Sequence, residues 1–243
     1  MIELRDVSKS YSLTSNAKQR VLALDRVSVV IGKGEFVSLV GPSGAGKSTL
    51  IRMLIAEEKP DQGSILIADR DIAVLKSREL PYYRRKIGVV FQDFKLLPAK
   101  TVWENIAFAL EVSDVSSGEI RERVPKILSL VGLSDKADNY PSELSGGEKQ
   151  RVAIARAMIH SPRILIADEP TGNLDPETTW EIVELLERIG RSGTTIILAT
   201  HNKAVVDKLK RRVIAVEHGR IVSDEKVGKY VVPSEIAAKE ASA

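Results

Sequence analysis

The order of apolar and polar residues divides the chain into a strand-rich beginning, a helical middle and an alternating end. Short β-rich segments at the beginning predict strands. The expected strands cover residues 2–7, 21–31, 36–40, 63–68 and 87–91. A helix over 47–58 is expected after the strand at 36–40 and the loop that follows it.

The middle of the chain shows helical spacing of apolar residues. We expect helices over 102–111, 117–131 and 146–160. Pro125 lies inside the second and has no backbone N–H to donate, so it should kink or restart that helix. A mostly helical insertion between strands indicates a small lobe, at about 93–161, that is able to move against the core.

Strands and helices alternate again towards the end of the chain. Such alternation is typical of an α/β fold, in which helices cover a largely parallel sheet. The expected elements are 163–168, 176–190, 194–200, 202–209 and 213–217. We find no internal repeat, so one domain over 1–232 is expected, followed by a tail at 233–243. The tail is rich in Ala, Glu and Lys and indicates a frayed helix or a mobile end, and the polar insert at 13–20 indicates a hairpin loop.

Composition narrows the class of protein. With 243 residues, 43% hydrophobic and 28% charged, the chain resembles a soluble globular protein with a full core. A net charge of only +3 gives no reason to expect nucleic-acid binding. The absence of cysteine excludes a disulfide framework and a thiolate metal site. No signal peptide or membrane-spanning run is present, so we expect a cytosolic protein that contacts a membrane only through another chain.

The segment GPSGAGKST, residues 41–49, fits the phosphate-loop pattern in full. Its glycines let backbone N–H groups surround an anion, and the following helix turns its positive end towards the phosphates. Lys47 should bridge the β and γ phosphates of ATP, and Ser48 should ligate Mg²⁺. A fortuitous glycine-rich turn is the alternative, disfavoured by the apolar strand before it and the helix after it. The expected nucleotide-binding residues are Gly41, Pro42, Ser43, Gly44, Ala45, Gly46, Lys47, Ser48 and Thr49.

A second candidate group ends the apolar strand ILIADE at 164–169. Two adjacent carboxylates divide the chemistry well, with Asp168 holding Mg²⁺ and Glu169 acting as general base towards the attacking water. The alternative is that an Asp-Glu pair before Pro170 merely opens a turn. The phosphate loop elsewhere in the chain favours the chemical interpretation.

The heptapeptide LSGGEKQ at 144–150 lies between these two motifs. Alone it would be an ordinary glycine turn opening a helix. Together the three motifs closely resemble the ATP-binding cassette (ABC) family, and the resemblance extends from Ile2 to about Tyr230. It implies an ABC-type phosphate-loop ATPase with an N-terminal antiparallel β-subdomain and a helical subdomain. It also implies an ATP-dependent head-to-tail homodimer, in which Ser145, Gly146 and Gly147 face the nucleotide held by the other copy.

The same resemblance assigns Gln92, His201 and Asp175, whereas Tyr11 is a candidate because it is an aromatic residue that follows the first strand. Gln92 corresponds to the Q-loop glutamine, which touches Mg²⁺ or water and couples the nucleotide to the helical lobe; the alternative is a surface glutamine. His201, after an apolar strand, corresponds to the switch histidine, although a lone histidine is more often structural. Tyr11 would stack on adenine, or else pack against the polar insert. Asp175 lies in the D-loop, which links the two sites across the dimer.

Several stretches resemble the cell-division branch of the family, namely 91–97, 100–112, 167–178 and 193–195 with 199–201. That branch implies a transmembrane partner similar to FtsX, a position on the inner face of the bacterial plasma membrane and control of cell-wall hydrolysis. Alternatives are the ATPase of a lipoprotein-releasing or macrolide/peptide exporter, and a soluble ABC protein acting on ribosomes or DNA. Phe94, Leu96 and Leu97 are apolar residues of a loop, which suits either a partner site or packing of the helical lobe.

Overall fold

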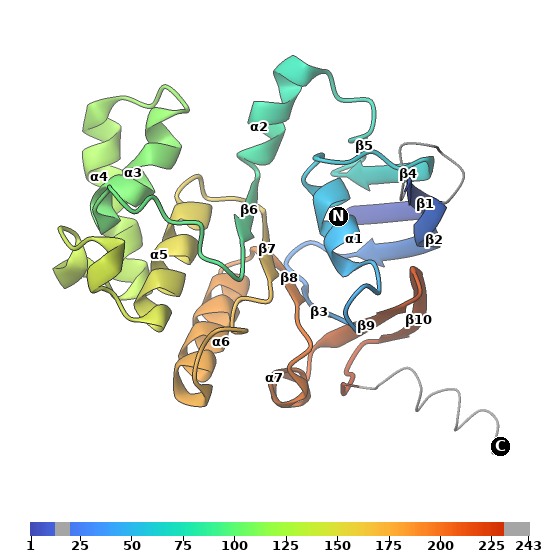
Figure 1. Cartoon of the computed structure of the whole chain (residues 1–243). Coiled ribbons are helices and arrows are strands. Elements are labelled where there is room, and N and C mark those ends of the chain that lie inside the picture. The colour runs from blue at the N-terminus through green and yellow to red at the C-terminus, as the bar shows by residue number, and fades with distance from the viewer. Residues whose placement is uncertain (13–19, 231–243) are drawn as a thin grey trace. The chain divides into compact units, whose positions relative to one another are not determined.

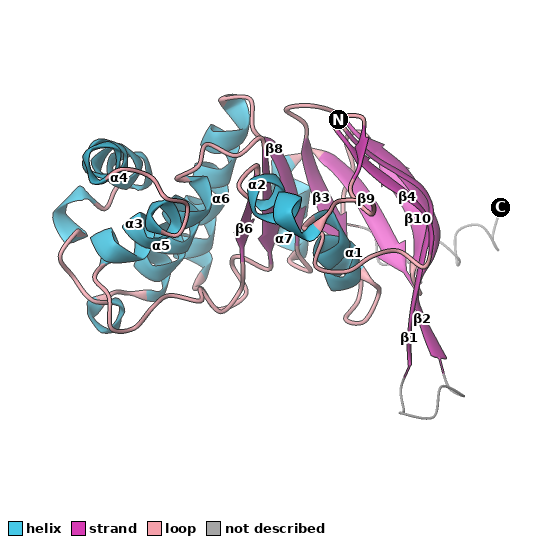
Figure 2. Ribbon diagram, turned by 90° about the horizontal axis from the view of Figure 1, so that it is seen from above, coloured by secondary structure: helices cyan, strands magenta, loops and turns pink. Residues whose placement is uncertain are grey.

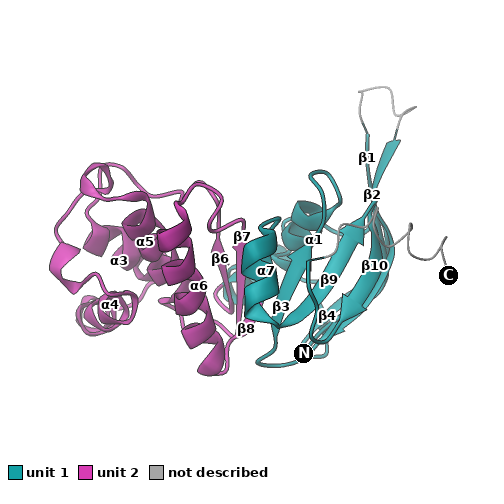
Figure 3. Ribbon diagram, turned by 90° about the horizontal axis from the view of Figure 1, so that it is seen from below, with its two compact units in different colours: residues 1–84, 197–243 teal, residues 85–196 magenta. Residues whose placement is uncertain are grey.

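The computed structural model describes residues 1–12 and 20–230 and divides into two compact units. Unit 1 comprises Met1–Arg84 and Ile197–Ala243, and unit 2 comprises residues 85–196 (Figure 3). The expected hairpin loop, apart from Arg20, and the expected tail at 233–243 lie outside the described residues. Within the part of the chain that is described, no helix has the length and apolar character needed to cross a membrane.

Unit 1 contains an antiparallel sheet with the strand order β2-β1-β4-β5 (Figure 1). Leu4 pairs with Val29 on one side and with Ile65 on the other, and all three side chains are buried. The short strand β5 was not predicted, because two polar residues carry no apolar pattern. The strands are β1 (Ile2–Ser12), β2 (Arg20–Ile31), β4 (Gln62–Ile67) and β5 (Arg70–Asp71).

A second sheet in unit 1 has the order β10-β9-β3 and continues with the end of β8 (Thr195–Ala199). Strand β3 (Phe36–Val40) is buried along its whole length and pairs in parallel with β9 (Arg212–Glu217). Burial on both faces is typical of parallel strands, which explains why β3 is continuously apolar. The antiparallel edge strand β10 (Arg220–Glu225) escaped sequence analysis because its residues are mostly polar and exposed.

The helices of unit 1 are α1 (Lys47–Leu54), α2 (Leu80–Arg84) and α7 (Lys203–Leu209), with a 3₁₀ turn at Ser77–Glu79. Helix α1 ends four residues earlier than expected. Ala56 adopts a left-handed conformation with φ 53°, which stops the helix. The guanidinium of Arg84 donates to the carbonyl oxygens of Ile55 and Ala56, both at 3.1 Å, and holds the turn that follows.

Unit 2 combines parallel strands with helices, and its helices α3, α4, α5 and α6 lie beside one another in Figure 2. Val89 of β6 (Ile87–Val90) pairs with Ile166 of β7 (Ile164–Asp168), and the first residues of β8 belong to the same unit. Short 3₁₀ turns lie at Ser134–Lys136 and Pro141–Glu143. The helices are α3 (Val102–Glu111), α4 (Ser117–Val131), α5 (Gly146–Met158) and α6 (Pro176–Arg191).

Helix α4 runs through Pro125 without interruption, so the expectation that the helix restarts there was wrong. Proline leaves the carbonyl of Arg121 without its helical donor, but both residues are exposed, so water is available to that carbonyl. Val124 and Leu128 are buried on the opposite face and keep the helix packed. The helix ends at Gly132, which takes the left-handed conformation that glycine allows at low cost.

Arg212 joins three parts of unit 1. Its side chain is 14% exposed and donates to both carboxylate oxygens of Asp224, at 2.7 and 2.6 Å. It also donates to Glu35 at 3.0 Å and to the Val30 carbonyl at 2.8 Å. The hydrogen bonds to Asp224 raise the pKa of Arg212 above its ordinary value, so its charge persists throughout the accessible pH range.

Replacing Arg212 with glutamine should lower the free energy of unfolding by about 2–4 kcal/mol, because Glu35 and Asp224 then lose a shared cation. Urea denaturation measures the change. Arg5→Gln is the matched control: the Arg5 side chain, which pairs with Glu3, is 58% exposed, so its loss should cost much less stability than the loss of Arg212. Equal losses in the two variants would contradict the role given to Arg212.

Candidate functional site

The phosphate loop of unit 1 requires glycine at two positions, because of the backbone conformation and the close approach of neighbouring strands. Gly41 and Gly46 have φ of 150° and 109°, and α1 begins directly after Gly46. A Cβ on Gly41 would lie 2.1 Å from the Val216 carbonyl oxygen, and one on Gly46 would lie 2.5 Å from that of Ala23. Backbone carbonyl groups of β9 and β2 therefore lie so close to the loop that only glycine fits at these two positions.

Lys47 is the first residue of α1 and is 9% exposed. Its ammonium group donates to the carbonyl oxygens of Gly41, at 2.7 Å, and Pro42, at 3.0 Å. The loop thus holds a cation beside the N-terminal end of a helix, where the backbone N–H groups carry partial positive charge. This arrangement suits a polyanion such as a triphosphate.

His201 lies two residues after the end of β8 in unit 1, and it is exposed. The residues on either side fix its backbone. The N–H of Thr200 donates to the Leu39 carbonyl at 3.1 Å, and Asn202 caps α7 by accepting from Val205 at 3.2 Å. The imidazole is therefore presented from a rigid strand end.

Tyr11 lies near the end of β1, and its ring is half-buried. The Lys9 ammonium group lies 5.5 Å from the ring centroid, a cation–π contact on one face. The phenol oxygen is buried and has no hydrogen-bond partner among the described residues. Stacking of adenine would therefore use the other ring face, and this role stays a prediction.

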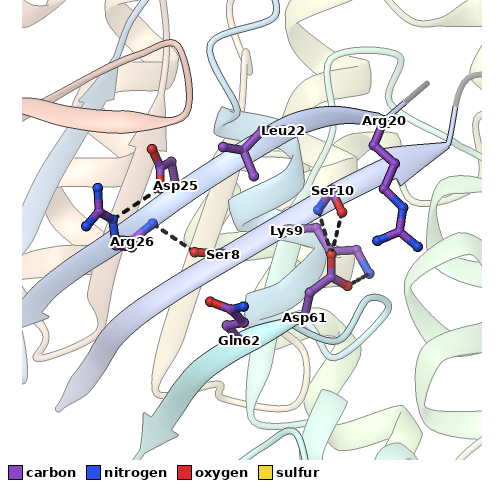
Figure 4. A pocket seen from close by; sticks show the side chains of 9 residues that line it. All are labelled: Ser8, Lys9, Ser10, Arg20, Leu22, Asp25, Arg26, Asp61 and Gln62. Carbon is purple, nitrogen blue, oxygen red and sulfur yellow. Dashed lines mark hydrogen bonds and ion pairs between the residues drawn. The ribbon is translucent and has the colours of Figure 1, made fainter. Parts of the chain in front are cut away.

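A polar pocket of about 540 Å³ lies on the same strands (Figure 4). Asp61 is at its centre and accepts from the backbone N–H and the hydroxyl of Ser10, both at 2.8 Å, while Lys9 lies 3.6 Å away. These neighbours, led by the Ser10 N–H, lower the pKa of Asp61 below its ordinary value. Several lining residues already pair with one another, as Asp61 does with Ser10 and Lys9, and we assign the pocket no ligand. It is lined by Ser8, Lys9, Ser10, Arg20, Leu22, Asp25, Arg26, Asp61 and Gln62.

In unit 2, Asp168 ends β7 and Glu169 follows it, both with half-buried side chains. Glu169 has φ 49°, which is uncommon for a residue other than glycine. Its carbonyl accepts from the Gly172 N–H at 3.1 Å, closing a tight turn. Strained backbone of this kind concentrates at functional sites, which is consistent with the role predicted for Glu169.

The Gln92 amide reaches the same turn from another part of unit 2. Its Nε2 donates to Oδ1 of Asn173 at 3.3 Å, and Nδ2 of Asn173 donates back to the Gln92 carbonyl at 3.4 Å. A Cβ on Gly172 would lie 2.9 Å from Gln92 Nε2. The predicted Q-loop residue is therefore linked directly to Asn173, two residues before Asp175 of the predicted D-loop.

Ser145 caps the N-terminus of α5 in a reciprocal arrangement with Glu148. The Ser145 hydroxyl oxygen accepts from the Glu148 N–H at 3.2 Å, and the Glu148 carboxylate accepts from the Ser145 N–H at 2.8 Å. That backbone donor lowers the pKa of Glu148 below its ordinary value. Ser145 itself is exposed, so its O–H proton can still be donated to a ligand.

The two glycines after Ser145 pack against the start of α6. A Cβ on Gly147 would lie 2.3 Å from Cγ2 of Thr178, and one on Gly146 would lie 3.1 Å from Cδ2 of Leu174. Asp175 caps α6 by accepting from the Thr178 N–H at 3.0 Å. Hydrogen bonds from Thr178 lower the pKa of Asp175 below its ordinary value. Gly147 therefore has a packing role that sequence analysis missed.

The predicted site residues divide between the two units. Those in unit 1 are Tyr11, the phosphate loop from Gly41 to Thr49, and His201. Those in unit 2 are Gln92, Ser145, Gly146, Gly147, Asp168, Glu169 and Asp175.

The donor set suits a magnesium nucleotide better than a metal held by protein alone. Among the described residues, no group of three or more His, Cys, Asp or Glu could hold a metal ion. Mg²⁺ usually binds through one or two carboxylates together with substrate phosphates. Asp168 and Gln92 in unit 2, and the exposed Ser48 in unit 1, each carry an oxygen ligand of the kind that Mg²⁺ prefers, and their shared role stays a prediction.

Three buried or half-buried polar residues in unit 2 were missed because their partners are distant in sequence or cannot be inferred from it. Asn105 is fully buried and accepts from the Leu97 N–H at 2.8 Å. Arg156 donates to carbonyl groups about sixty residues earlier in the chain. Both amide atoms of Gln150 are buried without a hydrogen-bond partner among the described residues. For Asn105 and Gln150 the only sequence signal is a polar residue on the apolar face of a predicted helix, and Arg156 gives none.

Gly147→Ala should destabilise the protein by about 1–3 kcal/mol, because the new methyl group meets Thr178 Cγ2. Thermal unfolding measures the loss. Adding Thr178→Ser removes the clashing methyl group and should restore most of the stability. Gly118→Ala is the control, since Gly118 lies in α4 with open space around its Cβ position. A Gly147→Ala variant as stable as the control would contradict the packing role.

Comparisons with known proteins agree with the three motifs. Residues 24–172 match the family model described as ABC transporter. The cell division ATP-binding protein FtsE of Bacillus subtilis (strain 168) is 55% identical over 230 residues, covering 95% of this chain and 98% of the relative. The protein of the same name from Mycobacterium tuberculosis is 52% identical, with the same coverage of both chains. A methionine import ATP-binding protein of Listeria monocytogenes is 46% identical over 100% of this chain and 73% of its own length.

Solved structures agree on the fold. A dimeric ATP-binding cassette in a post-hydrolysis state, bound to ADP and phosphate, is 36% identical with a TM-score of 0.83, covering 95% of this chain and all of that one. A cassette from Clostridium perfringens, part of an ABC transporter complex, is 31% identical with a TM-score of 0.82, covering 98% of this chain and 91% of that one.

These matches confirm the predicted α/β phosphate-loop fold and the predicted ABC-type ATPase. They cover the phosphate loop, the LSGGEKQ turn and the acidic end of β7 in one continuous alignment. The chain therefore belongs to the ABC transporter family of ATP-binding cassettes.

Proposed function

We propose that this ATPase is the nucleotide-binding subunit of a bacterial cell-division complex and drives conformational change in a transmembrane partner similar to FtsX. The observation that carries the proposal is the identity of 52–55% with proteins named FtsE, over 95% of this chain and 97–98% of theirs. Methionine import relatives, by contrast, extend well beyond the region they share with this chain. The output proposed is control of cell-wall hydrolysis.

The residues divide the work as follows. The phosphate loop binds the phosphates through its backbone N–H groups, and Lys47 exchanges its loop carbonyls for the β and γ phosphates. Ser48, Asp168 and Gln92 hold Mg²⁺, which neutralises phosphate charge when bound. Glu169 orients and deprotonates the attacking water, and His201 donates to the γ-phosphate. Tyr11 stacks on adenine.

The second copy of the chain completes each site in this proposal. Ser145, Gly146 and Gly147 offer the N-terminal end of α5 and a hydroxyl group to the γ-phosphate bound by the opposite subunit. Asp175 lies in the loop that crosses to the other site. Two ATP molecules then hold a head-to-tail dimer together, and loss of the γ-phosphate releases it. The dimeric cassette among the solved structures supports this arrangement.

The proposed location of this ATPase follows from the proposed transmembrane partner, to which it binds. The ATPase acts at the cytoplasmic face of the plasma membrane and contacts it through the FtsX-like protein. Membership of a family named for transporters supports work with a membrane partner. An importer ATPase is the second candidate, favoured by the 46% identity with methionine import proteins. Exporter ATPases and soluble ABC proteins remain the alternatives that the sequence motifs allow.

Glu169→Gln should bind ATP with unchanged affinity but turn it over at least ~100-fold more slowly, because the amide cannot accept the proton of water. The ATP-bound variant should accumulate as a dimer, measured by analytical ultracentrifugation. Lys47→Ala is the comparison: it should weaken ATP binding by roughly 10–100-fold and give no ATP-dependent dimer. Rapid hydrolysis by the Glu169 variant, or a monomer with ATP bound, would overturn the sandwich mechanism.

The cell-division role is tested by reconstitution with an FtsX-like protein in lipid nanodiscs. The wild-type ATPase should bind these nanodiscs with a defined stoichiometry, and its ATP turnover should change on binding. Nanodiscs carrying a methionine-importer permease are the control and should bind at least ~10-fold more weakly. Preference for the importer permease would move the protein to the second candidate and leave the site chemistry intact.

A further inference from the structure

The loop after Gln92 has an unfavourable backbone that its surroundings must hold. Phe94 and Lys95 are consecutive left-handed residues, with φ of 56° and 49°. The Lys95 N–H donates to the Asp93 carbonyl at 2.5 Å, which makes the turn very tight. Two such residues in sequence each cost about 1 kcal/mol or more, so this shape persists only where other groups fix it.

Arg156 of α5 is the group that fixes the turn. One guanidinium nitrogen donates to the Lys95 carbonyl at 2.7 Å, and the other donates to the Phe94 carbonyl at 3.0 Å. The planar guanidinium has two donors at fixed spacing, which match two consecutive carbonyl groups. A lysine has one ammonium centre and cannot reproduce this fork.

Two further contacts hold the rest of the loop. The Lys95 ammonium group lies 3.9 Å from the centroid of the Phe91 ring. Asn105 of α3 accepts from the Leu97 N–H at 2.8 Å and donates towards the carbonyl groups of Leu97 and Lys100, at 3.1 and 2.9 Å. The loop from 91 to 100 is therefore preformed within unit 2.

The fixed loop presents a surface of mixed chemistry. Phe94, Leu96 and Leu97 are half-buried, and Lys95 is exposed. Apolar groups next to a cation suit an amphipathic peptide segment with an acidic side chain at its edge. A cytoplasmic segment of the transmembrane partner is the occupant that the proposed function supplies, so this step rests on that proposal.

Helix α5 connects this loop to the LSGGEKQ turn at 144–150. It begins at Gly146, directly after Ser145, and Arg156 lies ten residues further along. At ~1.5 Å per residue, the two points are about 15 Å apart on one rigid helix. We infer that Arg156 is a positioning residue. It shapes the loop at 91–100 that receives the partner, and it makes this loop move with the N-terminal end of α5, which the proposed function places against the γ-phosphate.

Arg156→Lys tests this inference, because it keeps the charge and removes the fork. Backbone amides at 93–100 should exchange hydrogen at least ~10-fold faster in the isolated protein. Affinity for nanodiscs carrying the FtsX-like protein should fall at least ~10-fold. Protection of amides within α3 and α5 should stay as in the wild type, which shows that the fold is intact.

Arg84→Lys is the matched control. Arg84 makes the same kind of fork, to the carbonyl groups of Ile55 and Ala56, and Ala56 is also left-handed. This control should leave both the exchange at 93–100 and the nanodisc affinity unchanged. Wild-type exchange or wild-type affinity in Arg156→Lys would overturn the inference, as would an equal loss in Arg84→Lys. Failure of the wild-type protein to bind FtsX nanodiscs would instead overturn the proposed function, and the inference with it.

Discussion

The burial of central strands on both faces is the constraint on which the rest of the structure depends. Strands β3 and β8 are buried along their whole length, and β7 is buried up to Asp168. Burying a polar group costs free energy unless it is hydrogen-bonded, so such strands hold few polar side chains, of which Ser38 in β3 is one, and most polar groups lie where the strands end. The phosphate loop follows β3, the acidic pair ends β7, and His201 follows β8. The positions of the candidate site residues therefore follow from where the buried strands end.

Much of this arrangement could be predicted from sequence. The bounds expected for α3 and α4 agree with the structure, because Thr101 and Ser116 cap their starts and Gly132 ends the second. The motifs at 41–49 and 144–150 identified the family. Edge strand β10 was missed because its residues are mostly polar. The prediction that the helix restarts at Pro125 was wrong, because the carbonyl that loses its hydrogen bond there is exposed and water can replace the donor. The spacing of apolar residues and the capping residues therefore predict those helices and strands that are buried on at least one face or capped at their ends.

Contacts between distant residues could not be predicted in this way. Gly147 is a glycine because Thr178 packs against it, and Arg156 finds its acceptor on Phe94, 62 positions away in the sequence. A family motif assigned the glycine to the nucleotide, yet its packing role is visible only in three dimensions. Nothing in the local sequence marks Arg156 among the other basic residues of its helix. Residues that connect one functional segment to another are thus the ones that require the structure.

The central claim is that an ABC ATPase works on a cell-division membrane partner. Affinity capture tests it most directly: the Glu169→Gln protein, held with ATP and Mg²⁺, is recovered from detergent-solubilised membranes of its own cells, and the captured proteins are identified by mass spectrometry. Our account predicts recovery of one FtsX-like membrane protein, in roughly equal amount to the ATPase, together with cell-division components. Recovery of a solute permease with its substrate-binding or efflux proteins, and no FtsX-like protein, would contradict it.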